Sequence, residues 1–104
     1  RQRLMCIRDM SLYKRGYEHY RKGDYDLAIS ELTDSIVMNP SSSVAYWVRG
    51  LAYSKTDLYE QAIDDYDLAI RLDPTEHKLY RNRGIVFHKL NLERQALRDF
   101  SEAI

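Results

Sequence analysis

Histidine and cysteine, which often bind metals or act in catalysis, are scarce in this chain and lie far apart. His19, His77 and His88 are the histidines, and none forms an i, i+4 pair or stands at metal-ligand spacing from the single cysteine, Cys6. No histidine stands near Cys6 to activate its thiol. We therefore expect no metal site and no catalytic cysteine, and we expect His19 to fill space between helices.

Carboxylates gather at residues 24–26 and 64–67. Neither group is followed by the glycine and distant glutamate of a calcium loop, and the chain has no glycine-rich phosphate loop and no serine nucleophile motif. We interpret Asp24 as a helix cap and the second group as part of a solvated convex face. The sequence therefore predicts no catalysis and no cofactor.

The composition is that of an ordered globular protein: of 104 residues, 44% are hydrophobic and 31% charged, with a net charge of +0. Neutrality argues against nucleic-acid binding. No stretch approaches the ~18 apolar residues of a membrane span and no signal peptide is evident, so we expect no membrane contact. The single cysteine favours a reducing compartment, so we expect an intracellular, cytoplasmic location. Because the chain begins with Arg rather than Met, we interpret it as part of something longer.

The chain repeats itself with a period of 34 residues. When residues 43–70 are compared with residues 77–104, ten of 28 pairs are identical, whereas ordinary composition would give roughly two. The recurring positions include glycines, alanines and prolines: Gly16, Gly50 and Gly84; Ala28, Ala62 and Ala96; Pro40 and Pro74. One unit repeated three times therefore accounts for most of the sequence.

Each unit predicts two antiparallel helices. In the second unit Tyr46, Gly50 and Tyr53 share one face of a helix over about 44–56, and Ala62, Tyr66 and Ala69 share a face of a helix over about 59–72. Short polar turns join the two helices. The prolines of Asn39-Pro40 and Asp73-Pro74 end the second helices, and the serines at 41–43 offer N-caps for the next helix.

This helix-turn-helix pattern resembles the tetratricopeptide repeat family. In family order, its characteristic positions are occupied here by Leu12, Tyr46 and Tyr80; Gly16, Gly50 and Gly84; His19, Tyr53 and Phe87; Ala28, Ala62 and Ala96; Leu32, Tyr66 and Phe100; Ser35, Ala69 and Ala103. The chain departs from the family in having Arg15, Arg49 and Arg83 before the glycines, and His19 and Ser35 at core positions of the first unit. The resemblance implies an all-α superhelix, or solenoid, of antiparallel helix pairs that serves as a protein-interaction scaffold.

The units are expected at 9–42, 43–76 and 77–104, the last one truncated. Residues 1–8 are either a disordered end or the end of a preceding repeat, and both ends suggest a longer array. Exposed apolar side chains at such ends, including Leu97, Phe100 and Ile104, favour self-association.

In such a solenoid the first helices line a concave groove and the second helices face outward. In the second unit, the partner helix leaves one face of the first helix open. The residues on this face, together with those 34 positions before and after them, are the candidate groove residues, and Tyr20 and His88 border them. The candidates are Tyr13, Lys14, Tyr17, Arg21, Trp47, Val48, Leu51, Lys55, Lys78, Arg81, Asn82, Ile85 and Lys89. For Val48, Leu51 and Ile85, packing between adjacent first helices is an equal alternative.

This groove fits a protein or peptide ligand with hydrophobic and acidic residues. We expect Tyr13, Tyr17 and Trp47 to take an apolar side chain, and Lys78 and Arg81 to hold a carboxylate. An acidic middle on the outward helices would leave the groove basic.

Some members of the resembled family bind the C-terminal tails of heat-shock chaperones through a carboxylate clamp of Lys, Asn, Asn, Lys and Arg. The matching residues here are Tyr13, Tyr17, Val48, Lys78 and Asn82, of which only Lys78 agrees. We therefore expect these three units not to form that clamp.

The function expected is a peptide-binding module, within a larger scaffold or co-chaperone-type protein and without enzymatic activity. Two alternatives stay open. The chain is a structural spacer or self-association element of a longer solenoid, or it is the targeting arm of a larger enzyme.

Overall fold

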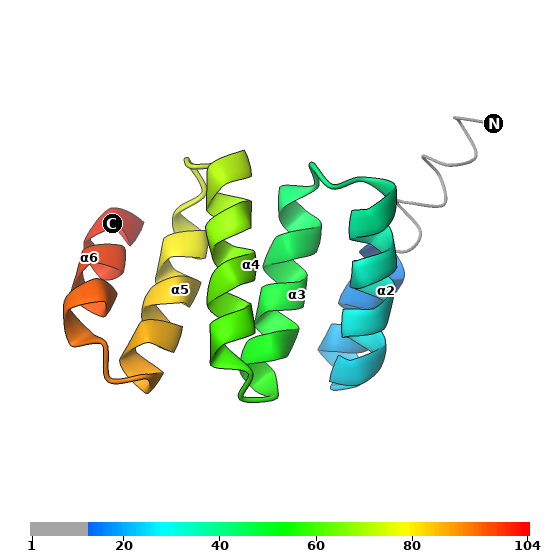
Figure 1. Cartoon of the computed structure of the whole chain (residues 1–104), viewed down its shortest axis with the longest axis horizontal. Helices are drawn as coiled ribbons and strands as arrows, with labels where there is room; N and C mark the ends of the chain where they lie inside the picture. The colour runs from blue at the N-terminus through cyan, green and yellow to red at the C-terminus, as the bar shows by residue number, and fades with distance from the viewer. Residues whose placement is uncertain (1–12) are drawn as a thin grey trace.

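A computed structural model of the chain describes residues 13–104. A helical segment over residues 13–22 is followed by five further helices: α2 (Tyr25–Met38), α3 (Ser43–Lys55), α4 (Tyr59–Leu72), α5 (His77–Lys89) and α6 (Glu93–Ala103). Helices α2 to α6 stand side by side in one row, successive helices running in opposite directions, with the helical segment 13–22 behind α2 (Figure 1). The described residues therefore form an all-α stack of antiparallel helix pairs, as the repeat predicts.

The helix boundaries follow the local sequence signals. Helix α4 has the bounds predicted for it, and α2 and α4 end immediately before Asn39-Pro40 and Asp73-Pro74. At the start of α3, the Ser42 hydroxyl accepts a hydrogen bond from the backbone N–H of Ala45, at 3.2 Å. Asp24 stands at the N-cap of α2, as predicted, but its side chain makes no capping hydrogen bond. Its carboxylate lies instead 3.8 Å from Nδ1 of His19.

The turn inside each unit repeats one backbone conformation. Gly23, Asp57 and Asn91, which are 34 residues apart, have φ values of 88°, 63° and 62°. After each of them the next backbone N–H reaches back to a carbonyl five residues earlier, as in the 2.9 Å bond from Leu58 to Tyr53. Glycine, aspartate and asparagine tolerate this left-handed region best, which explains why these three residue types occupy the equivalent position of the three units.

Glycine allows the two helices of a unit to approach closely. A Cβ atom on Gly50 would lie 2.7 Å from the ring of Tyr66, and one on Gly16 would lie 2.6 Å from Leu32. Between units, Tyr46 packs with Ala69 and Leu79, joining α3, α4 and α5. The core is therefore a series of small clusters along the stack, each shared by neighbouring helices.

Candidate functional site

Two adjoining hollows lie between the first helices of the three units. The first, which we call the aromatic hollow, has a volume of ≈ 360 Å³ and is lined by residues of the helical segment 13–22, α3 and α5. Its lining residues are Tyr13, Tyr17, Tyr20, Val44, Trp47, Val48, Leu51 and Lys78. Tyr17 is 41% exposed while Val48 is only 3% exposed, so tyrosines form the walls and Val48 the floor.

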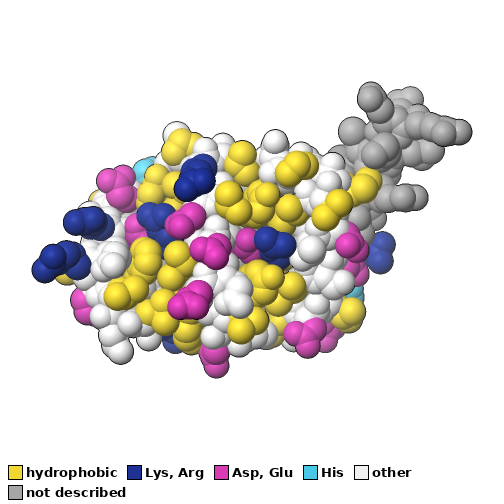
Figure 2. Space-filling view, in the orientation of Figure 1, with side chains coloured by type: hydrophobic (Ala, Val, Ile, Leu, Met, Phe, Trp, Pro, Cys, Tyr) yellow, Lys and Arg dark blue, Asp and Glu magenta, His cyan; other side chains and the backbone are white. Residues whose placement is uncertain are grey.

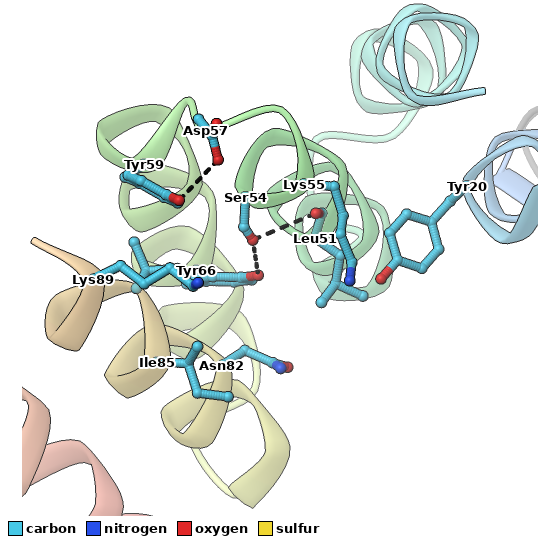
Figure 3. A pocket seen from close by; sticks show the side chains of 11 residues that line it. Tyr20, Leu51, Ser54, Lys55, Asp57, Tyr59, Tyr66, Asn82, Ile85 and Lys89 are labelled. Carbon is cyan, nitrogen blue, oxygen red and sulfur yellow. Dashed lines mark hydrogen bonds between the residues drawn. The ribbon is translucent and has the colours of Figure 1, made fainter. Parts of the chain in front are cut away.

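The second, which we call the polar hollow, has a volume of ≈ 390 Å³. Figure 3 shows the side chains that line it: Tyr20, Leu51, Ser54, Lys55, Asp57, Tyr59, Tyr66, Asn82, Ile85, Val86 and Lys89. Tyr20 and Leu51 line both hollows, which therefore adjoin. Both volumes are in the range of ligand sites in proteins.

A hydrogen bond between α3 and α5 holds the groove together. The indole Nε1 of Trp47 donates to Oδ1 of Asn82 at 2.9 Å. Because the indole N–H can only donate, the oxygen of the Asn82 amide must face it, and the amide NH₂ is left as a donor. This bond fixes the Trp47 ring in the aromatic hollow and orients Asn82 in the polar hollow.

The tyrosine hydroxyls of the polar hollow are neutral at physiological pH. Tyr66 is 1% exposed and its hydroxyl lies 3.4 Å from Oγ of Ser54. Burial raises the pKa of Tyr66 and also that of Tyr20. The Tyr59 hydroxyl donates to Oδ1 of Asp57 at 2.8 Å, and this hydrogen bond raises the pKa of Tyr59. These hydroxyls therefore act as hydrogen-bonding groups rather than as bases.

The comparisons with known proteins agree with this architecture. The sequence profile described as Tetratricopeptide repeat matches residues 13–77, more than half of the chain. The chain belongs to the tetratricopeptide repeat family. No curated protein matches it in sequence.

Solved tetratricopeptide repeat structures superpose closely on the chain. The second TPR of Spaghetti (RPAP3), bound to the HSP90 peptide SRMEEVD, is 29% identical with a TM-score of 0.89, over 92% of this chain and 89% of that one. The first TPR of Spaghetti, bound to the same peptide, is 26% identical with a TM-score of 0.90, over 93% and 77%. The Arabidopsis OM64 TPR domain, at 23% identity, a TM-score of 0.92 and 95% and 82% coverage, shows the fold alone.

Most of the predicted groove residues line the hollows of this tetratricopeptide repeat stack. The aromatic hollow includes Tyr13, Tyr17, Trp47, Val48, Leu51 and Lys78, and the polar hollow includes Leu51, Lys55, Asn82, Ile85 and Lys89. Lys14, Arg21 and Arg81 are exposed and line neither hollow. Val48 is buried in a cluster with Ala45, Ala52 and Leu32 and forms only the floor of the aromatic hollow.

The periodic pattern also missed some lining residues. Ser54 and Tyr59 line the polar hollow. The 34-residue pattern did not include Ser54 among the candidate groove residues. It also gave no sign that Tyr59, at the start of a second helix, would reach the polar hollow. His88 was expected at the border, but its Nδ1 lies 2.8 Å from Oε1 of Glu93, in a pair outside both hollows.

A second array of side chains runs from unit to unit away from these hollows. Arg49 forms two hydrogen bonds with Asp65 at 2.7 and 2.8 Å, and a third with Thr33 of the preceding unit at 3.1 Å. Arg83 repeats the arrangement with Asp99 and Asp67, all at 2.8 Å. Each of these arginines therefore joins the two helices of its own unit to the second helix of the unit before.

The prediction that residues 64–67 form a solvated face is consequently wrong for Asp65. This carboxylate is 2% exposed, with Arg49 as its partner, whereas Asp64 is exposed. The hydrogen bond to Asp65 raises the pKa of Arg49, and burial raises the pKa of Asp65 while Arg49 opposes that shift. Arg49 thus supplies the interactions that favour the ionised form of this buried carboxylate. In the view of Figure 2, charged side chains of both signs cross the middle of the face, between hydrophobic ones.

Among residues 13–104, no three His, Cys, Asp or Glu side chains come together to hold a metal ion. Nor does any helix there have the length and apolar character needed to cross a membrane. The predictions about Cys6 and residues 1–8 lie outside the described residues.

Proposed function

We propose that this chain binds a peptide segment of a partner protein along the groove formed by the aromatic and polar hollows. The observation that carries the proposal is the aromatic hollow, where Tyr13, Tyr17 and Trp47 surround open space beside the ammonium group of Lys78. Aromatic side chains around an open hollow are typical of the anchoring pockets of protein interfaces. The ligand would place an apolar side chain there.

The two Spaghetti TPR structures support the proposal, since each is bound to an HSP90 peptide. This chain should recognise its ligand through residues other than those of the carboxylate clamp that binds chaperone tails. Of the five residues that match the carboxylate clamp, Tyr13 and Tyr17 line an aromatic wall and Val48 is buried. We propose a ligand that combines hydrophobic and acidic residues. We also propose that the chain serves in an intracellular, cytoplasmic scaffold or co-chaperone-type protein and does not itself catalyse a reaction.

Trp47 provides a direct test because it is the only tryptophan of the chain. A random peptide library would be selected against the wild-type protein, and the selected peptides titrated while Trp47 emission is followed. We expect a saturable change in emission. A labelled peptide measured by fluorescence anisotropy should lose about 30-fold in affinity for Trp47→Ala or Tyr17→Ala, as for a central anchor worth ~2 kcal/mol.

Leu27→Ala is the matched control, because Leu27 is 53% exposed on α2 and lines neither hollow. Its affinity should equal that of the wild type. If selected peptides bind Trp47→Ala and the wild type equally, the groove is not their site and the proposal fails.

Self-association is a second candidate, favoured by the outer face of α6. There Leu97, Phe100 and Ile104 are 66%, 36% and 99% exposed. The equivalent side chains of the second unit include Tyr66, which is 1% exposed where α5 covers it. A second copy of the chain could cover the α6 face in the same way. Sedimentation should then show a dimer that Leu97→Lys converts to a monomer, and a wild-type monomer at high concentration would exclude this candidate.

A further inference from the structure

The polar hollow contains two cations that have no anionic partner among the described residues. Lys55 stands at the end of α3 and Lys89 at the end of α5, and their ammonium groups enter the hollow from two sides (Figure 3). No ion pair joins either lysine to another described residue, whereas Arg49 and Arg83 in the same helices are fully paired. The two like charges lie in one hollow, where they repel each other and favour the binding of an anion.

Helix electrostatics alone explains only part of this arrangement. A basic residue in the last turn interacts favourably with the negative end of the helix dipole, which accounts for the positions of Lys55 and Lys89 in the sequence. It does not require both side chains to line the same hollow. Asp57 is the single acidic residue in the lining, and its Oδ1 already accepts a hydrogen bond from Tyr59. The lining therefore keeps a net positive charge.

Asn82 adds a directed donor to these charges. Its oxygen is occupied by Trp47, so its NH₂ group is the part of the amide that remains for a ligand. No described residue accepts a hydrogen bond from this NH₂ group. Lysine ammonium groups and an amide NH₂ are together suited to a carboxylate, which accepts several hydrogen bonds.

We propose that the polar hollow binds an aspartate or glutamate side chain of the peptide, between Lys55 and Lys89 and with Asn82 as hydrogen-bond donor. The inference rests on the proposed function, because the same peptide places its apolar side chain in the aromatic hollow. The chain of the ligand crosses Leu51 and Tyr20, which line both hollows.

This assignment moves acid recognition away from the residues that the sequence suggested. Arg81 is exposed and lines neither hollow, and Lys78 lines the aromatic hollow without a second cation in the lining. The polar hollow instead has two cations, a free amide donor and space for a side chain.

The test compares two double variants that lose the same charge. Peptides selected on the wild type are synthesised with their acidic residue as Glu or Gln, and their affinities are measured for wild type, for Lys55→Gln with Lys89→Gln, and for Lys78→Gln with Arg81→Gln. We expect the wild type to prefer the Glu peptide about tenfold. The first double variant should lose this preference yet keep its affinity for the Gln peptide, and the second should retain the preference.

Each other outcome overturns a specific claim. Peptides that bind the groove without an acidic preference leave peptide binding in the groove intact, but they overturn the carboxylate site and with it the acidic part of the proposed ligand. A preference lost in the Lys78 and Arg81 variant instead assigns the acid to those residues and also overturns it. If a phosphoserine peptide binds while its Glu counterpart does not, the hollow recognises phosphate rather than carboxylate. Failure of every selected peptide to change Trp47 emission removes the proposed function and the inference with it.

Loss of folding would not be mistaken for loss of binding. All four substituted residues are exposed, so both double variants should retain the wild-type circular dichroism. Lys55→Gln with Lys89→Gln should lower the melting temperature only slightly, through the loss of two favourable interactions with helix C-termini. Retained affinity for the Gln peptide provides the same control within the binding assay.

Discussion

At the scale of single residues, the arginine before the glycine of the second unit forms a partly buried network of polar and aromatic contacts. The guanidinium carbon of Arg49 lies 5.9 Å from the ring centroid of Tyr46 and 5.7 Å from that of Tyr53, and its nitrogens reach Asp65 and Thr33. The aromatic rings shield the ion pair from water, and the bidentate geometry satisfies both oxygens of the carboxylate. A polar residue can therefore occupy a core position.

Removing one partner of this pair should be far more costly than removing both. Asp65→Ala leaves Arg49 partly buried and unpaired, so we expect the free energy of unfolding to fall by about 3–5 kcal/mol. Arg49→Leu combined with Asp65→Leu should stay within about 1 kcal/mol of the wild type, or exceed it. Urea denaturation followed by circular dichroism measures both.

Arg15→Ala is the comparison from the first unit. Arg15 approaches Glu31 at 3.3 Å with 61% of its side chain exposed, so its removal should cost less than about 1 kcal/mol. Equal losses for Asp65→Ala and Arg15→Ala would contradict the view that burial makes the difference.

At the scale of elements, caps decide where helices begin, and glycines decide how closely they pack. The two effects are separate, because Ser42 acts on the backbone of its own helix whereas Gly50 acts on the contact with α4. Each can be tested with one substitution.

Ser42→Ala removes the acceptor for the N–H of Ala45 at the start of α3. We expect a loss of about 1 kcal/mol in unfolding free energy. Ser41→Ala is the control, since Ser41 is exposed and its hydroxyl does not cap the helix, and it should change stability by less than about 0.5 kcal/mol. A loss of the same size in both variants would assign the effect to something other than the cap.

Gly50→Ala opposes two effects of known sign. Alanine favours the helix by about 1 kcal/mol, but its Cβ would lie 2.7 Å from the Tyr66 ring, and overpacking costs ~1–3 kcal/mol. Because Tyr66 is 1% exposed and cannot move aside, we expect a net loss of about 1–2 kcal/mol by chemical denaturation. A stabilised Gly50→Ala protein would show that the ring shifts freely.

At the scale of the whole molecule, most contacts are made between neighbouring helices along the stack, with a smaller set between α3 and α5. Leu79 is the fully buried side chain through which α5 meets Tyr46 and Ala69. In such a quasi-linear array, stability is a sum over units and the interfaces between them. A weakened interface should therefore release one end of the stack and leave the other end ordered.

Leu79→Ala should cost about 2–5 kcal/mol and lower the hydrogen-exchange protection of α5 and α6 more than that of α2. Leu32→Ala is the matched variant, because Leu32 is equally buried among Ala28 and Ala45 at the other end. It should lower protection in the helical segment 13–22 and α2 first. Hydrogen exchange with mass spectrometry distinguishes these patterns, and uniform loss in both variants would show that the stack opens as one unit.

The sequence predicted most of the groove residues, because residues 34 positions apart lie on the same face of equivalent helices in successive units. Tyr13, Tyr17 and Trp47 were placed together in this way, and they line one hollow. Tyr59 was missed because it belongs to a second helix and enters the polar hollow only through the packing of α4 against α3. Whether Lys55, Lys78 or Arg81 faces the ligand also depends on that packing.

The helices, their ends and their antiparallel pairing follow from the sequence alone. These depend on local sterics, since Pro40 and Pro74 cannot continue a helix and the residues at 23, 57 and 91 accept a left-handed turn. The burial of Asp65, the position of Val48 at the base of the aromatic hollow and the hydrogen bond from Trp47 to Asn82 could be found only in the folded chain. These facts depend on how helices stack, because a side chain's burial and partners are set by residues 16 to 35 positions away rather than by its own turn of helix.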